Sequence, residues 1–113
     1  MYKDYKEITT GISEYMAELK KMIPDTMQGF SAMAKGATEP KVLDKKTKEF
    51  CALAIAVATR CDGCIGFHTK ALKNLSATRE EVAEVLGMAV YMGGGPSVMY
   101  AADALRSFDQ FSA

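Results

Sequence analysis

The stretch "KEFCALAIAVATRCDGCIGFHTKAL", residues 48–72, decides the fold because it joins a long apolar segment to a cluster of two cysteines and one histidine. Residues 50–58 are apolar on every side, and a helix of this kind is buried in a core or between subunits. Asp44 is a suitable N-cap for this helix, and another helix is expected to follow it over 62–74. If the two helices pack side by side, the chain reverses near 59–60. The quoted stretch therefore predicts a helical hairpin.

The sequence before the hairpin predicts two further helices. Over 8–22, apolar residues recur at three- and four-residue steps, which is typical of one face of an amphipathic helix. We expect this helix to end near Lys21. Asp25 or Thr26 can cap a short second helix, which closes over 36–40.

The sequence after the hairpin predicts two more helices and no strand. Thr78 and Glu81 have the spacing of a capping box, which starts a fifth helix that ends at the glycines 93–95. Pro96 suits the first turn of a sixth helix over 97–108. The inward residues of that helix are expected to be Val98, Ala101, Ala102, Leu105 and Phe108. Because no segment alternates apolar and polar residues, the fold class is all-α, with about six helices in a single domain.

The cluster has the spacing of a reactive thiol site. Cys61, Cys64 and His68 are separated by three and four positions, so all three project from one face if this segment is helical. At a helix start, unpaired N–H groups and the positive end of the helix dipole favour a thiolate over a thiol. His68 can accept a proton from Cys64, which pairs a nucleophile with a base. Asp62 opposes a thiolate by its negative charge, and Arg60 partly offsets Asp62.

Glu49 is expected to lie opposite His68. Both residues are about ten positions from the reversal of the hairpin, hence roughly 15 Å along each helix axis. A carboxylate on an otherwise apolar helix can simply face solvent, and Lys45, Lys46 and Lys48 indicate that this end of the helix reaches solvent. Taken together with His68, the favoured interpretation is that Glu49 orients the imidazole.

Other interpretations of the cluster are ranked by spacing. Haem attachment needs a histidine directly after the second cysteine, where this chain has Ile65, and a thioredoxin-type motif needs a strand before the cysteines. A zinc site made by Glu49 and the three residues of the cluster stays open, although structural zinc sites usually draw ligand pairs from separate loops. Plain core packing also stays open. Cys51, inside the apolar helix and without a base, is expected to be buried and structural.

The overall composition excludes several classes of function. Fourteen basic and fourteen acidic residues cancel, which does not favour binding to nucleic acid or to an acidic membrane surface. The N-terminus lacks the apolar segment of a secretory signal, and glycines and Pro96 break the uncharged stretch 85–102. We therefore expect a cytoplasmic protein without a membrane span. Six short helices cannot bury all of the apolar residues, which predicts a homo-oligomer.

The pattern Glu49, eleven residues, Cys61-x-x-Cys64, three residues, His68 resembles the motif of the alkylhydroperoxidase AhpD-like branch of the carboxymuconolactone decarboxylase family. The flanking text "ATREEVAEVL", residues 77–86, adds to the resemblance. The similar region covers about 46–105 of a single domain expected over 1–113. The resemblance implies an all-α fold that carries the motif on a helical hairpin and assembles into homotrimers or homohexamers.

The resemblance also implies thiol-dependent redox chemistry, as a peroxidase with antioxidant function or as a disulfide reductase. Cys64 would attack a hydroperoxide and become a sulfenic acid, which Cys61 would convert to a disulfide, while His68 and Glu49 relay the proton. A lipoylated protein or a thioredoxin-like reductant would reopen the disulfide at the more exposed sulfur, expected to be that of Cys61. The resemblance implies no metal, and no cofactor other than this redox-active disulfide.

Two features depart from better-studied peroxidases of the family. Those peroxidases can carry a histidine between the cysteines, where this chain has Asp62 and Gly63, which predicts a weaker proton relay. The chain is also shorter, so its N-terminal helices and subunit contacts must close the substrate site. Candidate wall residues are Phe67, Tyr91, Met92 and Tyr100. The alternatives are a lactone-processing decarboxylase of the same family, which does not need the cysteine pair, and a redox-switch oligomer without enzyme activity.

Overall fold

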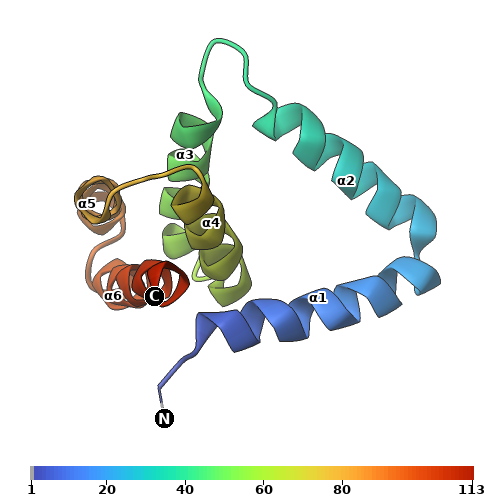
Figure 1. The fold of residues 1–113 in the computed structure, drawn as a ribbon, viewed down its shortest axis with the longest axis horizontal. Helices are drawn as coiled ribbons and strands as arrows, with labels where there is room; N and C mark the ends of the chain where they lie inside the picture. Colours follow the sequence, from blue (N-terminus) through green and yellow to red (C-terminus); the bar gives the residue numbers. More distant parts are fainter. Residues whose placement is uncertain (1) are drawn as a thin grey trace.

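The computed structural model describes residues 2–113, over which it contains six α-helices and no strand. The helices are α1 (Tyr5–Met22), α2 (Pro24–Thr38), α3 (Lys45–Ala58), α4 (Asp62–Asn74), α5 (Arg79–Gly93) and α6 (Gly95–Ser112). The expected all-α fold is confirmed, and α3 and α4 form the predicted hairpin (Figure 1). None of the helices described over residues 2–113 has both the length and the apolar character needed to cross a membrane.

Side-chain caps set the starts of α3 and α5 where the sequence predicted them. The Asp44 carboxylate accepts a hydrogen bond from the Thr47 backbone N–H at 2.7 Å, and this bond lowers the pKa of Asp44. The Glu81 N–H donates to the Thr78 hydroxyl, and the Thr78 N–H donates back to the Glu81 carboxylate at 2.9 Å. Each cap satisfies N–H groups that have no partner within their helix.

The start of α2 differs from the prediction. The helix begins at Pro24, directly after Ile23, and no side chain caps it. Neither Asp25 nor Thr26 is the N-cap, because both already lie in the first turn. A proline at this position gives up no helical hydrogen bond, and its fixed φ suits a helix. A single residue therefore separates α1 from α2.

Helices α3 to α6 form the body of the molecule, and the first half of α1 crosses it at α4 and α6 (Figure 1). The fully buried apolar side chains of the core come from five helices, α1 and α3 to α6, and are Tyr5, Leu53, Val57, Ile65, Leu72, Val82 and Ala104. Burying one leucine or isoleucine stabilises a fold by about 2 kcal/mol. Because Leu53 and Ile65 lie on the facing sides of the hairpin, this core also sets how α3 and α4 lie relative to each other.

The buried face predicted for α6 was partly wrong. The predicted inward residues Val98 and Ala102 are exposed, whereas the buried face includes the polar residues Asp103 and Ser107. The Ser107 hydroxyl is hydrogen-bonded to the hydroxyl of Thr69 in α4. The apolar pattern misplaced this face because it assigns only apolar residues to the core, whereas polar residues can also be buried when they are hydrogen-bonded inside the fold. The helix is also longer than predicted at both ends.

α3 buries only one of its sides within the protomer. Leu53 and Val57 face the core, whereas Ile55 is exposed and Cys51 is a free, exposed cysteine. The prediction that Cys51 is buried is therefore wrong for the protomer. A helix that is apolar all round gives no pattern from which the core side can be read.

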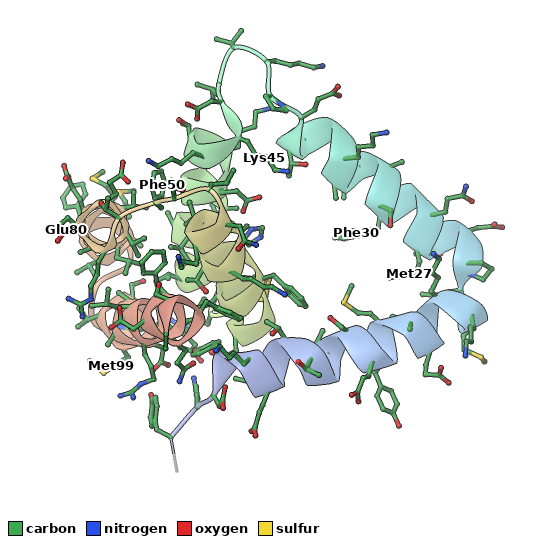
Figure 2. All side chains as sticks on the ribbon, in the orientation of Figure 1. Met27, Phe30, Lys45, Phe50, Glu80 and Met99 are labelled. Carbon is green, nitrogen blue, oxygen red and sulfur yellow. A yellow bond between two sulfur atoms is a disulfide. The ribbon has the colours of Figure 1, made fainter. Side chains whose placement is uncertain are left out.

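The second half of α1 and all of α2 form an arm that stands away from the body (Figure 1). Residues 11–22 are all exposed, and within the described chain α2 contacts only α1 and α3. The Lys48 ammonium ties the far end of the arm to α3 by donating to two carbonyls at the end of α2. Figure 2 shows Met27 and Phe30 on the inner side of the arm. The arm therefore leaves apolar side chains such as Phe30 and Met33 exposed within the described residues.

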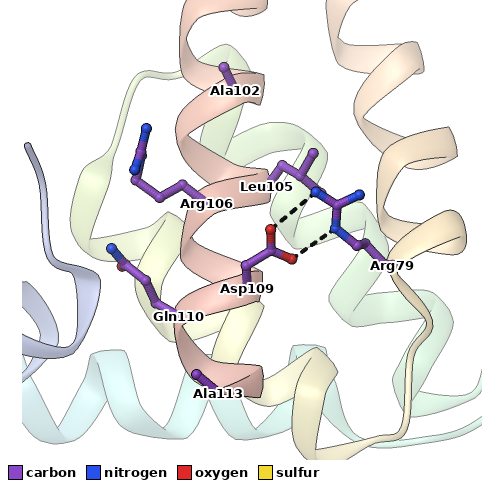
Figure 3. Close-up of a pocket in the computed structure, with 7 residues that line it drawn as sticks. All are labelled: Arg79, Ala102, Leu105, Arg106, Asp109, Gln110 and Ala113. Atoms are coloured by element: carbon purple, nitrogen blue, oxygen red, sulfur yellow. Dashed lines mark hydrogen bonds and ion pairs between the residues drawn. The ribbon is translucent and has the colours of Figure 1, made fainter.

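An ion pair joins the start of α5 to the end of α6 beside a surface hollow (Figure 3). The Arg79 guanidinium donates to both oxygens of Asp109, at 2.9 and 3.1 Å, and this pairing raises the pKa of Arg79. The hollow has a volume of about 530 Å³ and is also lined by Leu105 and Arg106. Both ionic partners are exposed, so the pair holds two helix ends together at the surface and is not part of the core.

Candidate active site

A tight reversal brings the start of α4 back beside the end of α3. Thr59 ends α3, and Arg60 adopts the left-handed conformation with a φ of 59°. The Cys61 N–H donates to the Ala56 carbonyl at 3.0 Å, which closes the turn. A left-handed conformation costs a non-glycine residue roughly 1–2 kcal/mol, and here it makes Cys61 the N-cap of α4.

Cys61 and Cys64 form a disulfide at the N-terminus of α4, with their Cα atoms 5.3 Å apart. The Cys64 N–H donates to the Cys61 sulfur at 3.2 Å. Both side chains are half-buried, so their exposure does not distinguish which sulfur an outside dithiol would reach. Within residues 2–113, no group of three or more His, Cys, Asp or Glu side chains is arranged to hold a metal ion. Once reduced, both sulfurs would lie beside the unpaired N–H groups of the first turn.

Glu49 reaches across the hairpin to His68, as expected from their equal distance to the reversal. The Glu49 Oε2 atom lies 2.6 Å from the His68 Nδ1 atom, without a bridging residue. The Glu49 side chain is 7 % exposed and the His68 side chain 30 % exposed. An ionised carboxylate can only accept a hydrogen bond, so Nδ1 carries the proton and Nε2 is left to exchange one. The pair therefore has the geometry of a base and its orienting acid.

α1 packs against the cysteine helix at two glycines. A Cβ atom on Gly63 would lie 2.7 Å from the Ile12 Cδ1 atom, and one on Gly66 would overlap the side chain of Thr9. The two glycines therefore allow a close approach of α1 to α4, and a larger residue at either position would have to displace the Ile12 or Thr9 side chain. Gly63, which the sequence marked only as a departure from the peroxidase motif, lies in this helix contact.

Asp62 is held in a polar network and does not stand free beside the cysteines. The Lys3 ammonium lies 3.1 Å from each Asp62 carboxylate oxygen and 2.9 Å from Asp103 Oδ2. The Tyr5 hydroxyl donates to Asp62 Oδ1 at 2.8 Å. The sequence offered only Arg60 as a counter-charge to Asp62, whereas the structure supplies Lys3.

The network changes the acidity of its members. Burial and the hydrogen bond to Asp62 raise the pKa of the Tyr5 hydroxyl well above its usual range. Burial alone would lower the pKa of the Lys3 ammonium, but the hydrogen bonds and charges of Asp103 and Asp62 outweigh it and raise this pKa. The hydrogen bond to Asp103 likewise raises the pKa of Tyr2. All three groups therefore stay protonated in the neutral range.

Sequence reasoning did not find Lys3, Tyr5 and Asp103. Their partners lie 57 to 101 positions away along the chain, beyond the reach of any local pattern. The one available signal was Asp103 itself, a charged residue within an otherwise apolar part of α6. A buried charge is retained only when it is paired, which points to an unidentified cation nearby.

The four candidate wall residues are dispersed in the protomer. Phe67 lines a hollow of about 390 Å³ between α1 and α4. The Tyr100 ring lies beneath the Lys3 ammonium, which is 5.0 Å from the ring centre. Tyr91 and Met92 are 78 % and 77 % exposed, so they wall no enclosed site within one protomer.

Three similar proteins bear on the family of this chain. An uncharacterized protein from Cupriavidus necator is 41% identical over 113 residues, which is 100% of both chains. The apo crystal structure of a carboxymuconolactone decarboxylase family protein from Legionella pneumophila has a TM-score of 0.94 and 56% identity, covering 96% of this chain and 97% of that one. A carboxymuconolactone decarboxylase family protein from Thermotoga maritima has a TM-score of 0.72 and 28% identity, covering 77% and 90%.

The profile of the carboxymuconolactone decarboxylase family matches residues 24–107. This range begins at α2 and ends within α6, so it includes the whole hairpin with Glu49, both cysteines and His68. The similar crystal structures and the family profile point to the same family. The chain belongs to the carboxymuconolactone decarboxylase family.

Proposed function

We propose that this protein is a thiol-dependent oxidoreductase of the AhpD-like branch, acting as a hydroperoxidase or a disulfide reductase. The observation that carries the proposal is the Cys61–Cys64 disulfide at the start of α4, followed on the same helix by His68 bonded to the buried Glu49. A dithiol, a base and a group that orients the base are the parts that thiol catalysis needs. For the Thermotoga maritima relative, a part in an antioxidative response has been suggested.

The oxidative half of the reaction consumes the dithiol. The Cys64 thiolate attacks a hydroperoxide oxygen, the O–O bond breaks, and Cys64 becomes a sulfenic acid. His68, which has taken the Cys64 thiol proton at Nε2, gives it to the leaving alkoxide to form an alcohol, while Glu49 holds the imidazole in place. Cys61 then gives its thiol proton to His68, its thiolate attacks the sulfenic sulfur, and the leaving hydroxide takes that proton and becomes water. Two electrons pass from the dithiol to the peroxide, and Cys61–Cys64 becomes a disulfide.

The reductive half restores the dithiol. A dithiol on a lipoylated protein or a thioredoxin-like reductant attacks the Cys61 sulfur and forms a mixed disulfide, which releases Cys64 as a thiolate. The second thiol of the reductant then displaces Cys61 and becomes part of the reductant's own disulfide. If the oxidant is another disulfide instead of a peroxide, the reduced Cys61–Cys64 pair reduces it by the same kind of thiol–disulfide exchange and becomes a disulfide itself. The redox-active disulfide is the only cofactor in this scheme, and a reducing cytoplasm suits its regeneration.

We also infer that the protein works as a homotrimer or homohexamer. Large apolar side chains are exposed on the arm, the end of α5 and the start of α6, namely Phe30, Met33, Met88, Tyr91, Met92, Val98 and Met99. Large apolar side chains exposed in such numbers on neighbouring helix turns are typical of subunit interfaces. Both assemblies are closed symmetric arrangements that would cover this surface.

A lactone-processing decarboxylase of the same family is the main alternative. That activity needs neither a disulfide nor a histidine held by a buried carboxylate, so it leaves the Glu49–His68 contact and the cysteine pair without a use. A redox switch without turnover uses the same dithiol and differs only in having no catalytic cycle.

A thiol count on the purified protein tests the proposal. The reduced chain has three thiols, and a hydroperoxide should leave one of them, which a dithiol restores to three. Cys64→Ser should prevent the internal disulfide, whereas Cys51→Ser, which changes an exposed cysteine outside the site, should still lose both remaining thiols. Sustained peroxide consumption with a dihydrolipoyl or thioredoxin recycling system distinguishes an enzyme from a switch. Unchanged thiols in the native protein would contradict the proposal.

A further inference from the structure

The polar network around Asp62 adjoins the dithiol, but the reaction scheme above does not use it. The Lys3 ammonium contacts both Asp62 and Asp103 and lies over the Tyr100 ring. The Lys3 side chain is only 31 % exposed, and that of Asp103 only 7 %. A lysine without a local task normally extends its ammonium into water. This one is instead enclosed by two carboxylates and an aromatic face that come from α4 and α6.

The position of Asp62 gives this ion pair a consequence for the cysteines. Asp62 is the first residue of α4, directly after Cys61 and two positions before Cys64. A carboxylate within one helical turn of a thiolate repels it and lowers the fraction of thiol that is ionised. Lys3 places a positive charge against that carboxylate, shared with Asp103, and so offsets part of the negative field of Asp62 that opposes the helix dipole at the start of α4. Without Lys3, Asp62 and Asp103 would both lack this counter-charge.

We propose that Lys3 is a positioning residue of the redox site, whose ammonium offsets the charge of Asp62 and thereby raises the fraction of the reduced dithiol that is in its reactive thiolate form at neutral pH. The inference rests on the proposed function, because the dithiol is the group on which it acts. The Tyr5 hydroxyl supports the arrangement by holding one Asp62 oxygen from the other side. The residues before α1 thus belong to the site, although they are far from it in sequence.

The elements that pack against the network carry other charged and titratable groups. They are Tyr2 and Tyr5 from the N-terminal segment, Arg60 from the reversal, Glu49 and His68 from the hairpin, and Tyr100, Asp103 and Arg106 from α6. Arginine and tyrosine side chains do not change charge near neutral pH, and only the histidine and cysteine types titrate between about pH 5 and 9. A His68→Gln background therefore isolates the titration of the thiols.

Alkylation of the reduced protein by iodoacetamide measures the thiolate and needs no peroxidase turnover. The thiolate attacks the iodoacetamide carbon, a C–S bond forms, and iodide leaves. In a background with Cys51→Ser, which leaves only the pair, and His68→Gln, Lys3→Met should slow alkylation at pH 7 by about three- to tenfold and move the midpoint of the pH–rate profile upward by roughly half to one pH unit. Lys3→Arg keeps the charge and should stay within about twofold of the parent protein.

A matched control and a second background make this test specific. Lys21→Met removes the same charge from the distant end of α1, where Lys21 pairs with the exposed Glu18, and should alkylate like the parent. In an Asp62→Asn background, Lys3→Met should change the rate by less than about twofold, because no carboxylate at position 62 remains to be neutralised.

Two outcomes would overturn the proposal. The first is an unchanged pH–rate profile in Lys3→Met with a lower melting temperature, which would mean that Lys3 only anchors α1. The second is a full effect of Lys3→Met in the Asp62→Asn background. The proposed function fails by a different result, namely thiol counts that stay unchanged after peroxide treatment. Even then, the alkylation profile would decide whether Lys3 acts on the thiols.

Discussion

Asp62 and Gly63 show at the scale of single residues how the fold and the candidate site share the same positions. The Asp62 side chain turns away to Lys3 and Tyr5, and Gly63 leaves room for Ile12 of α1. The two residues that depart from the peroxidase motif are therefore the ones on which the N-terminal segment docks. In the proposed mechanism, proton transfer is carried out by His68, four positions after Cys64.

Substitution of His68 should show whether it acts as a base. We expect His68→Gln to slow thiol oxidation near neutral pH by about a hundredfold or more, since a positioned general base contributes at least that much. Glu49→Gln keeps a hydrogen-bond acceptor but loses the charge, and should slow the reaction by about tenfold. The measurement is the rate of disulfide formation with a hydroperoxide across a pH series.

Glu84→Gln is the matched control for Glu49→Gln, because it makes the same change at an exposed glutamate of α5 and should leave the rate unaltered. The melting temperature of His68→Gln should stay close to that of the parent, because the imidazole is partly exposed. A His68→Gln protein that fails to fold would mean that the histidine is a core residue and not a base.

α1 is the element that joins the N-terminal part of the chain to the site. The first half of α1 packs on α4 where Thr9 meets Gly66. At the start of α4, Asp62 is bound by Tyr5 and Lys3. Residues 11–22 are exposed, and among the described residues α1 contacts α2, α4 and α6. Docking of the helix is therefore concentrated in about two turns next to the cysteines.

The acidity of the network predicts how α1 responds to alkaline pH. The pKa values of Tyr5 and Lys3 are raised in the folded state above their ordinary values of about 10 and 10.5. A raised folded pKa means that its stabilising contribution is complete below the unfolded pKa and is lost as the pH rises above it. The free energy of unfolding, measured by urea titration, should therefore fall between about pH 10 and 12.

Tyr5→Phe should identify the tyrosine part of this loss. The variant lacks the hydrogen bond to a charged carboxylate, which should cost about 1.5–3 kcal/mol at pH 8, and its alkaline decline should be shallower. Tyr15→Phe, at an exposed tyrosine of the same helix, is the control and should follow the parent at every pH. If Tyr5→Phe retained the full alkaline decline, the Tyr5–Asp62 contact would not be its source.

At the scale of the whole molecule, a compact four-helix body carries an arm that is open to solvent. The radius of gyration is 14.3 Å, compared with about 13 Å for a compact chain of this length. The arm and the body both expose large apolar side chains (Figure 2). In the symmetric assembly proposed above, neighbouring arms and bodies would cover each other's apolar side chains.

The assembly can be tested by the molar mass in solution. Light scattering after size-exclusion chromatography should give three or six chains of 12.3 kDa. Phe30→Asp should lower that mass, because a charge would be buried in an apolar interface, while the helical content stays unchanged. Gln28→Asp adds the same charge at an exposed polar position of α2 and should leave the assembly intact. A parent protein that elutes as a single chain would refute the oligomer.

Features with short-range causes could be predicted from the sequence. The capping residues Asp44 and Thr78, the start of α4 and the reversal near Thr59 all follow from local periodicity and hydrogen-bonding chemistry. The Glu49–His68 contact could also be predicted, since the constant rise of an α-helix brings residues equally distant from a hairpin turn to the same height.

Only the tertiary structure decided which sides of α3 and α6 face the core, how α1 lies on α4, and which cation balances Asp62. Cys51 and Ala102 were misplaced because an apolar side chain fits a core and an interface equally well. Lys3 and Asp103 escaped prediction because their contact joins positions 100 residues apart. Helix periodicity and capping are set by neighbours within a few residues, whereas the pairing of buried charges depends on where the packed helices bring distant residues together.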